Sequence, residues 1–177
     1  AALEAGAQII NDVDGLSAFP EMARVAREFG AGLILMHRRG SPETMHELTQ
    51  YHDVTEEVFE ELDQSFKKVT AAGVERERVV LDPGIGFAKN AEQNLELMNH
   101  LERFQAWGRP ILVGPSRKSF LGALTGKAPR ERDWGTAAAV ALAVAGGAQI
   151  VRVDNVNAMA EVARVTHAIL KARRPVD

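Results

Sequence analysis

The sequence predicts an α/β fold of parallel strands with outer helices. Short aliphatic runs recur along the chain, and each ends in a polar or glycine-rich turn that leads into a helical stretch. The runs are continuously apolar rather than alternating, which is typical of strands buried on both faces of a parallel sheet. Five runs fit this description, at residues 8–10, 33–36, 79–81, 111–113 and 150–153.

Helical patterns lie between these runs. Residues 21–29 give a short helix that ends at Gly30, and a longer helix is expected from a capping box at Asp53 and Glu56 to Gly73. An Ala-rich stretch follows at 136–145. Two further helices are predicted from apolar stripes, which comprise Leu95, Met98, Leu101 and Phe104, and then Met159, Val162, Val165 and Ile169.

Residues 1–177 are interpreted as a single domain without a linker. Strand–helix alternation suggests a doubly wound sheet or a (β/α)8 barrel. A G-x-G-x-x-G dinucleotide fingerprint is absent, because Lys89 stands where the third glycine would follow Gly84 and Gly86. A complete (β/α)8 barrel needs about 250 residues, so a chain of 177 residues has room for about five of the eight βα units. We therefore expect a partial (β/α)8 TIM barrel, comprising about the last five βα units and incomplete at its N-terminus.

Composition excludes several classes of function. The chain has 21 basic and 24 acidic residues and a net charge of -3, which argues against a dedicated nucleic-acid binder. It contains no cysteine, which excludes disulfides and thiolate chemistry and fits a cytoplasmic location. Its apolar runs are short and interrupted, so no membrane association is expected.

Polar residues gather at the predicted strand ends, where parallel α/β proteins carry their functional sites. A carboxylate, amide, ammonium and guanidinium on one rim would suit a polar heterocycle and an anion. Each residue taken alone could equally cap a helix or form a structural ion pair. The strand-end residues are Asn11, Asp12, His37, Asp82, Lys118 and Arg152.

The segment Asp82-Pro83-Gly84-Ile85-Gly86-Phe87 is the sharpest local feature. Pro83 favours an extended conformation at Asp82, and the two glycines allow the backbone to approach a ligand. The Asp82 carboxylate could accept two parallel hydrogen bonds from an N–H/NH2 edge such as that of a pterin or guanine. A turn or capping role for Asp82 is the alternative.

A basic loop follows the fourth run, at residues 114–122. Arg117 and Lys118 are adjacent cations beside hydroxyl side chains, a combination that favours anions. If the last two runs are strands seven and eight of a barrel, this loop and the Arg152 loop occupy the fold's usual phosphate-binding position. A solvated basic turn is the alternative.

Two sets of residues are expected to be structural. The first matches no metal-ligand spacing and is assigned to a surface loop: His37, His46, His52 and Asp53. The second comprises loop cations and aromatic residues that pack on helices: Arg38, Arg39, Trp107 and Trp134.

Five motifs together resemble dihydropteroate synthase, the folate-pathway enzyme that sulfonamides target. They occur in the family's order, and the match covers essentially all 177 residues. The second includes Met36-His37, the third is the Asp-Pro-Gly-Ile-Gly-Phe segment and the fourth is Ser-Arg-Lys-Ser-Phe. Their positions are 10–13, 35–40, 82–87, 116–120 and 152–153.

The resemblance implies a transferase built on a (β/α)8 barrel and usually homodimeric. Its reaction would join 4-aminobenzoate to (7,8-dihydropterin-6-yl)methyl diphosphate, forming 7,8-dihydropteroate and diphosphate. Mg²⁺ is the expected cofactor, bound with the diphosphate. The family's magnesium ligand lies in its N-terminal third, which has no counterpart here, so no metal ligand is expected in this chain.

The resemblance also implies roles for individual residues. Asn11 and Asp82 would bind the pterin edge, and Lys118 would contact the pterin carbonyl and ring nitrogen. The residues implied to line the pterin slot are Val13, Met36 and Gly114.

The remaining implied roles concern the other substrate and the leaving group. Phe87 and Ser119 would position 4-aminobenzoate, and Arg152 would bind diphosphate. The expected catalytic residues are Lys118, Arg152 and Asp82.

Two departures from the family pattern affect the expected activity. Asp154 stands where the family has a histidine, and its carboxylate would repel an anion unless a cation intervenes or the side chain turns away. The missing N-terminal third leads us to expect that the parent protein is the enzyme, with little or no turnover by this chain alone. An open barrel edge is also expected to associate. The alternatives are a pterin-binding methyltransferase domain and a non-catalytic pterin-binding remnant.

Overall fold

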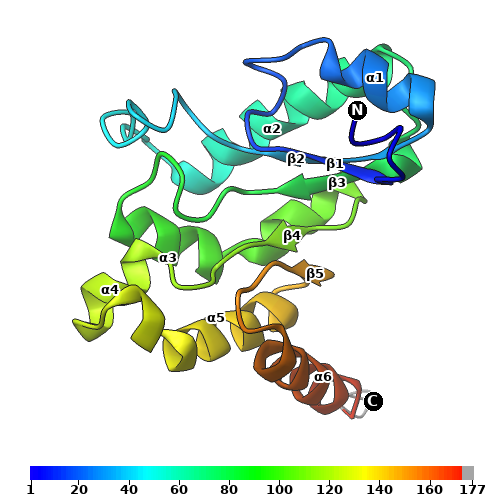
Figure 1. Ribbon diagram of the computed structural model, residues 1–177. Helices are drawn as coiled ribbons and strands as arrows, with labels where there is room; N and C mark the ends of the chain where they lie inside the picture. Colours follow the sequence, from blue (N-terminus) through cyan, green and yellow to red (C-terminus); the bar gives the residue numbers. More distant parts are fainter. Residues whose placement is uncertain (173–177) are drawn as a thin grey trace, which may run out of the picture.

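The computed structural model describes residues 1–172 and contains five parallel strands (Figure 1). Three of them form one sheet in the order β1-β2-β3, and β4 pairs with β5. A parallel bridge between Leu81 and Ile111 joins β3 to β4, so spatial neighbours follow chain order. This confirms the predicted parallel α/β fold, with the last two strands shorter than expected. The strands are β1 (Ile9–Asp12), β2 (Gly32–Met36), β3 (Val79–Asp82), β4 (Leu112–Val113) and β5 (Ile150–Val151).

Helices connect each strand to the next and lie outside the strands. In Figure 1, α1 and α2 lie on one side of β1–β3, and α5 and α6 lie beside β4 and β5. Short 3-10 helices are inserted between several of these elements. The helices are α1 (Met22–Phe29), α2 (Val54–Ala71), η1 (Arg76–Arg78), α3 (Ala91–Asn99), η2 (Leu101–Trp107), α4 (Ser119–Thr125), η3 (Pro129–Glu131), α5 (Asp133–Ala145) and α6 (Val156–Lys171).

Strand register decides which side chains share a face. Leu35 pairs with Leu81, and both are fully buried in the core beneath α2. Because side chains alternate along a strand, the next register pair, Met36 and Asp82, points to the opposite face. This is the face toward which the other strand ends also direct polar groups.

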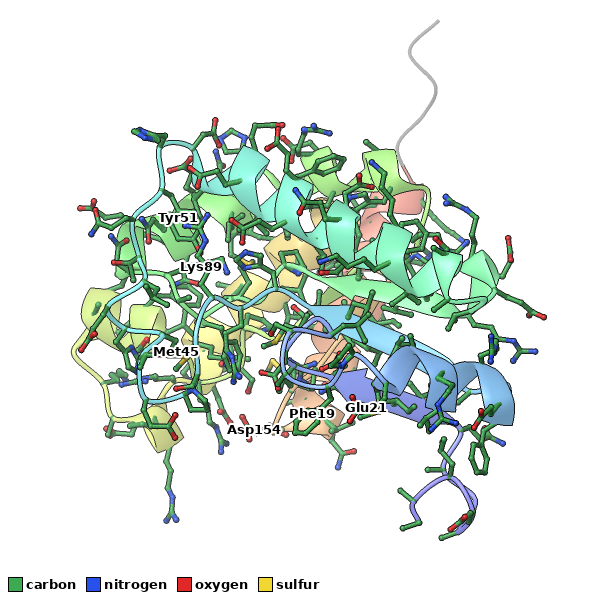
Figure 2. The ribbon with its side chains drawn as sticks, turned by 90° about the horizontal axis from the view of Figure 1, so that it is seen from above. Phe19, Glu21, Met45, Tyr51, Lys89 and Asp154 are labelled. Atoms are coloured by element: carbon green, nitrogen blue, oxygen red, sulfur yellow. The ribbon has the colours of Figure 1, made fainter. Side chains whose placement is uncertain are left out.

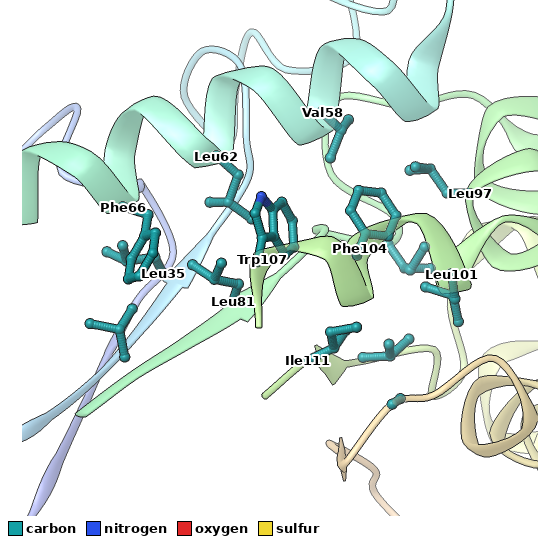
Figure 3. Close-up of a cluster of buried hydrophobic side chains, with 14 of the residues drawn as sticks. Leu35, Val58, Leu62, Phe66, Leu81, Leu97, Leu101, Phe104, Trp107 and Ile111 are labelled. Atoms are coloured by element: carbon teal, nitrogen blue, oxygen red, sulfur yellow. The ribbon is translucent and has the colours of Figure 1, made fainter. Parts of the chain in front are cut away.

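The core lies between β2, β3 and the α2 helix (Figure 3). The predicted α2 stripe is confirmed, since Val58, Leu62, Phe66 and Val69 are all buried. Aromatic rings extend this core towards η2. The Phe59 and Trp107 rings stack with centroids 5.0 Å apart, and Phe104 lies 5.0 Å from Trp107.

The predicted stripe after β3 is partly wrong. Leu95 is 39% exposed, whereas Leu97 is fully buried and takes its place. The chain leaves the α-helix after Asn99, and Leu101 and Phe104 lie in the 3-10 helix η2. The buried face of α3 instead carries Asn94, Leu97 and Met98, which are spaced as expected for one helix face, so Leu95 lies outside it.

Two smaller predictions also need correction. Asp53 caps α2 by accepting from the Glu56 amide, but the Glu56 carboxylate pairs with Arg103 instead of completing a capping box. The Glu57 carboxylate accepts from the Asp53 amide in its place. Trp107 packs in the core as expected, whereas Trp134 is 85% exposed on α5.

Within residues 1–172, no helix is both long and apolar enough to cross a membrane.

Candidate functional site

Strand-end residues converge around a cavity of about 340 Å³. Its walls come from the ends of β1, β4 and β5 and from the loop after β3. Six of the residues proposed from the sequence are among those that line it. The lining residues are Asn11, Val13, Phe87, Gly114, Ser116, Lys118, Arg152, Val153 and Asp154.

Asp82 lies directly behind this cavity at the end of β3. Its side chain is only 1% exposed, and one carboxylate oxygen accepts a hydrogen bond of 2.8 Å from the Gly84 amide. Burial raises the pKa of the Asp82 carboxyl, although the Arg152 charge and the Gly84 hydrogen bond oppose this shift. A carboxylate held in this way is preorganised to accept hydrogen bonds from a ligand.

Arg152 bridges the two sides of the cavity. Its guanidinium donates to Asp82 Oδ2 at 3.1 Å and to Asn11 Oδ1 at 3.3 Å. Gly114 provides the space for it, because a Cβ at this position would lie 2.9 Å from Arg152 Nη2. The acceptors of Asn11 and Asp82 therefore bind a planar array of N–H donors across strands β1, β3 and β5.

Lys118 forms another wall and contacts Phe87. Its ammonium lies 3.9 Å from the centre of the Phe87 ring. Gly86 allows this approach, because a Cβ there would lie 2.8 Å from Lys118 Cδ. Burial lowers the pKa of Lys118, and the nearby Arg152 charge adds to this effect. The wall thus combines an aromatic surface with a cation.

Arg117, in contrast, points away from the cavity and binds Asp133 at 3.0 Å. Its backbone has a positive φ of 55°, and its amide donates to Thr136 Oγ1. Arg132 donates to the carbonyl oxygens of Arg117 and Lys118. Of the two adjacent loop cations that were predicted to favour anions, Lys118 lines the cavity, whereas Arg117 anchors the loop.

Besides Asp82, two residues implied by the resemblance do not line the cavity. Met36 is fully buried next to Asp82 in the strand register, and Ser119 is exposed at the start of α4. Asp12, which follows Asn11 at the end of β1, accepts hydrogen bonds from the Asp14 and Leu16 amides and so shapes the following turn.

The prediction that His37 belongs to a surface loop is wrong. His37 is 4% exposed, and its ring nitrogens contact Glu61 Oε2 and Lys89 Nζ, each at 2.9 Å. Burial, together with the Lys89 charge, lowers the pKa of His37 to about 4, so the ring is neutral near neutral pH. Sequence reasoning missed Lys89 as a functional candidate. The available signal was a lysine two residues after Phe87, at the end of the Asp82–Phe87 segment.

The loop cations at 38 and 39 are also more than solvated charges. Arg38 pairs with Asp14, and both side chains are largely buried. Arg39 binds both Glu57 and Glu61 on α2 and donates to the Gln50 carbonyl at 2.7 Å. These contacts attach the loop after β2 to the α2 helix.

A family model described as pterin binding enzyme matches residues 1–154. The chain belongs to the pterin binding enzyme family. Its relatives include dihydropteroate synthases from Synechocystis, 47% identical over 169 residues, and from Bacillus subtilis, 42% identical over 169 residues. These alignments cover 95% and 96% of the chain, and so confirm the resemblance to dihydropteroate synthase.

Solved structures of this family have the same fold. A Yersinia pestis dihydropteroate synthase with a sulfonamide drug complex matches with a TM-score of 0.93 and 34% identity over 97% of this chain. The Thermus thermophilus enzyme in complex with 6HMPPP matches with a TM-score of 0.90 and 39% identity over 96% of the chain. The Xanthomonas albilineans enzyme with 4-aminobenzoic acid matches with a TM-score of 0.89.

The chain is a partial dihydropteroate synthase homologue. It spans 58% of the length of the Synechocystis relative and 57% of the Bacillus subtilis relative. It likewise spans 62% of the Yersinia pestis chain. The shared structure comprises parallel strands and outer helices that match part of a dihydropteroate synthase barrel.

Asp154 is turned toward Ser116. The Ser116 hydroxyl donates to Asp154 Oδ2 at 2.6 Å, and the Asp154 amide donates to Ser116 Oγ at 3.1 Å. The pair joins the loop after β4 to the loop after β5. The carboxylate thus has a partner at the rim of the cavity.

Magnesium does not fit the residues that the structure describes. Across 1–172, no three His, Asp or Glu side chains group as metal ligands. Asp154, the carboxylate that lines the cavity, already accepts from Ser116, and Asp82 behind the cavity is engaged by Arg152 and the Gly84 amide.

Proposed function

We propose that these 177 residues form the last five βα units of a (β/α)8 barrel of dihydropteroate synthase, and that they carry its pterin-binding face. The parent would join 4-aminobenzoate to (7,8-dihydropterin-6-yl)methyl diphosphate. Relatives support these substrates, since homologous structures contain pteroic acid, 4-aminobenzoic acid and 6HMPPP.

The observation that carries this proposal is the contact of Arg152 with Asp82 and Asn11. A guanidinium presents coplanar N–H donors, and so does the amino-pyrimidine edge of a pterin. The same two acceptors could therefore bind the pterin edge. Arg152 would then be released toward the diphosphate end of the substrate.

The other residues of the site suit a ligand that consists of a pterin ring and an anionic diphosphate group. Lys118 would donate to the pterin carbonyl and ring nitrogen, while Val13, Gly114 and the buried Met36 bound the ring slot. Phe87 would present an aromatic face to 4-aminobenzoate, with Ser119 near its carboxylate. Because Phe87 contacts Lys118, the proposed contacts to 4-aminobenzoate and to the pterin would lie on the same wall of the cavity.

The reaction needs charge stabilisation and positioning more than a covalent nucleophile. The C–O bond between the methylene carbon and diphosphate would break, and its electron pair would leave with the diphosphate. The amine nitrogen of 4-aminobenzoate would donate the pair for the new C–N bond and lose one proton to water. Arg152 would offset the negative charge of the departing group, Lys118 would hold the pterin carbonyl and ring nitrogen, and Asp82 would stabilise the electron-poor pterin.

Calorimetric titration of the chain with 6-hydroxymethyl-7,8-dihydropterin tests the binding proposal. Asp82→Asn should weaken binding by about tenfold to a hundredfold, because hydrogen bonds to a charged acceptor contribute about 1.5–3 kcal/mol. Asp63→Asn is the control, since Asp63 lies on α2 and pairs with Lys67. Equal pterin affinity in wild type and Asp82→Asn would refute the assignment.

A non-catalytic pterin-binding role for the isolated chain is the second candidate. It is favoured by the share of the relatives that the chain spans, 57% and 58%. Purified chain, given both substrates and Mg²⁺, should form little or no dihydropteroate, while the full-length parent should form it readily. Robust turnover by the 177-residue chain would show instead that these residues suffice.

A further inference from the structure

Lys89 carries a buried ammonium at the base of the Asp82–Phe87 turn. The residue is 8% exposed, and Nζ lies 2.9 Å from His37 Nδ1, 2.9 Å from the Phe87 carbonyl oxygen and 3.2 Å from the Gly84 carbonyl oxygen. A lysine ammonium has three donors. All three acceptors are therefore within reach of one group, and two of them belong to the turn itself.

The turn around Lys89 has an unusual backbone. Gly84, Gly86 and Ala88 all have positive φ, at 73°, 84° and 51°. For Ala88 this conformation is strained, so surrounding contacts must hold it. Asn94 holds one side by accepting from the Gly86 amide at 2.6 Å, and Lys89 holds the other side through the two carbonyls.

A second layer of charged groups orients Lys89. His37 accepts from Lys89 through Nδ1, so its Nε2–H donates to Glu61. Glu61 is in turn bound by Arg39, whose guanidinium lies 3.9 Å from the Tyr51 ring centre. Figure 2 shows Tyr51 and Lys89 on the same side of the molecule. The chain of contacts runs from α2 through β2 to the turn.

We propose that Lys89 is a positioning residue for the pterin site, where its ammonium holds the Gly84–Phe87 turn so that Asp82 and Phe87 face the ligand. This inference rests on the proposed pterin-binding function. His37 and Glu61 support Lys89 from behind and do not touch the ligand. Lys89 differs from Lys118 in this respect, because Lys118 lines the cavity itself.

The environment of Lys89 is consistent with a purpose beyond packing. Burying a charge is costly, and an apolar side chain of similar length would often stabilise a core as well or better. Burial lowers the pKa of Lys89 to about 7, while Asp82 and Glu61 favour its charged form and Arg39 opposes it. Above that pH the neutral amine has two donors for three acceptors, and the turn should loosen.

Lys89→Met is the principal test, with Lys67→Met as the matched control. Lys67 is exposed on α2 and pairs with Asp63. Two quantities are measured in folded protein: hydrogen exchange of the Gly84–Phe87 amides, and pterin affinity by calorimetry. In Lys89→Met, we expect these amides to lose about tenfold or more of their protection, and pterin affinity to fall by a similar factor.

The pH profile separates positioning from a merely structural role. Wild-type pterin affinity should decline as pH rises through about 7, and the Lys89→Met variant should lack that component. A folded Lys89→Met protein with unchanged turn protection and unchanged pterin affinity would overturn the proposal. So would a loss of global stability with no specific change at the turn.

His37→Phe keeps the test decisive if Lys89→Met does not fold. Phenylalanine is an aromatic residue with no hydrogen-bond acceptor and no charge, so the loss of protection should again centre on residues 84–87. Unchanged protection there would refute the inference. Failure of the wild-type chain to bind pterin would reject the proposed function instead, and the exchange experiment would still decide whether Lys89 holds the turn.

Discussion

Gly84 shows how closely single residues are constrained at the site. Its φ is 73°, and a Cβ would lie 1.9 Å from the His37 carbonyl oxygen. Gly84→Ala should therefore lower the free energy of unfolding by more than about 2 kcal/mol, because neither the backbone nor the β2 end can move freely. Denaturant unfolding measures this change.

Gly126→Ala is the matched control for this prediction. Gly126 has a similar φ of 68°, but no atom of residues 1–172 lies within 4 Å of the position that its Cβ would take. This substitution should cost only about 1 kcal/mol, the conformational penalty alone. Equal losses at the two positions would show that contact with His37 is unimportant.

Residues differ in how far the sequence could predict them. Asp82 and Lys118 follow aliphatic strands in distinctive motifs, so their place at the site could be predicted. Lys89 could not, because its burial depends on carbonyl groups and a histidine that only the tertiary fold brings together. The prediction that Trp134 packs on a helix was wrong. The sequence places Trp134 in a helix but does not show which helix face is covered, and in the described structure its side chain is 85% exposed.

At the scale of elements, α2 is joined to the end of β2 by the His37–Glu61 contact. Burial and the Lys89 charge lower the pKa of folded His37 to about 4, against 6.5 ordinarily. The unfolded chain therefore binds more protons between these values. Stability should fall by about 3 kcal/mol as the pH drops from about 6.5 to about 4. Urea unfolding at a series of pH values measures this loss.

His37→Gln should flatten this part of the stability profile, since glutamine does not titrate. In the wild type, a further loss of stability is expected as the pH falls below 4.5, the ordinary pKa of Glu61. Burial tends to raise that pKa, but the hydrogen bonds from His37 and Arg39 hold it at about 2. If the variant and the wild type lose stability in parallel between pH 6.5 and 4, another group is responsible.

The elements themselves were largely predictable, because continuous aliphatic runs and amphipathic stripes specify parallel strands and outer helices. Each predicted run overlaps a strand, although β4 and β5 are shorter than expected, and the α2 stripe was found where expected. The transition from α3 to η2 was not, since the switch in helical period depends on how Phe104 and Trp107 stack with Phe59.

At the scale of the whole molecule, both outer strands have exposed edges and apolar residues. Ile9 on β1 is 61% exposed and Ile150 on β5 is 38% exposed. We propose that the chain self-associates, because unpaired parallel edges and exposed apolar residues favour association. Light scattering should show an average mass that rises with concentration, and a stable monomer would contradict this.

Two variants distinguish the surfaces that could mediate association. Ile9→Lys places a charge on the β1 edge, and Trp134→Glu places one on the exposed face of α5. Edge pairing predicts that the first reduces association, and packing through α5 predicts that the second does. No effect from either would exclude both surfaces.

A crystal structure of this chain with a bound dihydropterin would test the proposed pterin site most directly. We predict that the amino-pyrimidine edge of the ring binds both Asp82 carboxylate oxygens, that Asn11 contacts the same edge, and that Arg152 has moved away from Asp82. A ring bound elsewhere, with the Arg152–Asp82 contact of 3.1 Å intact, would contradict this assignment.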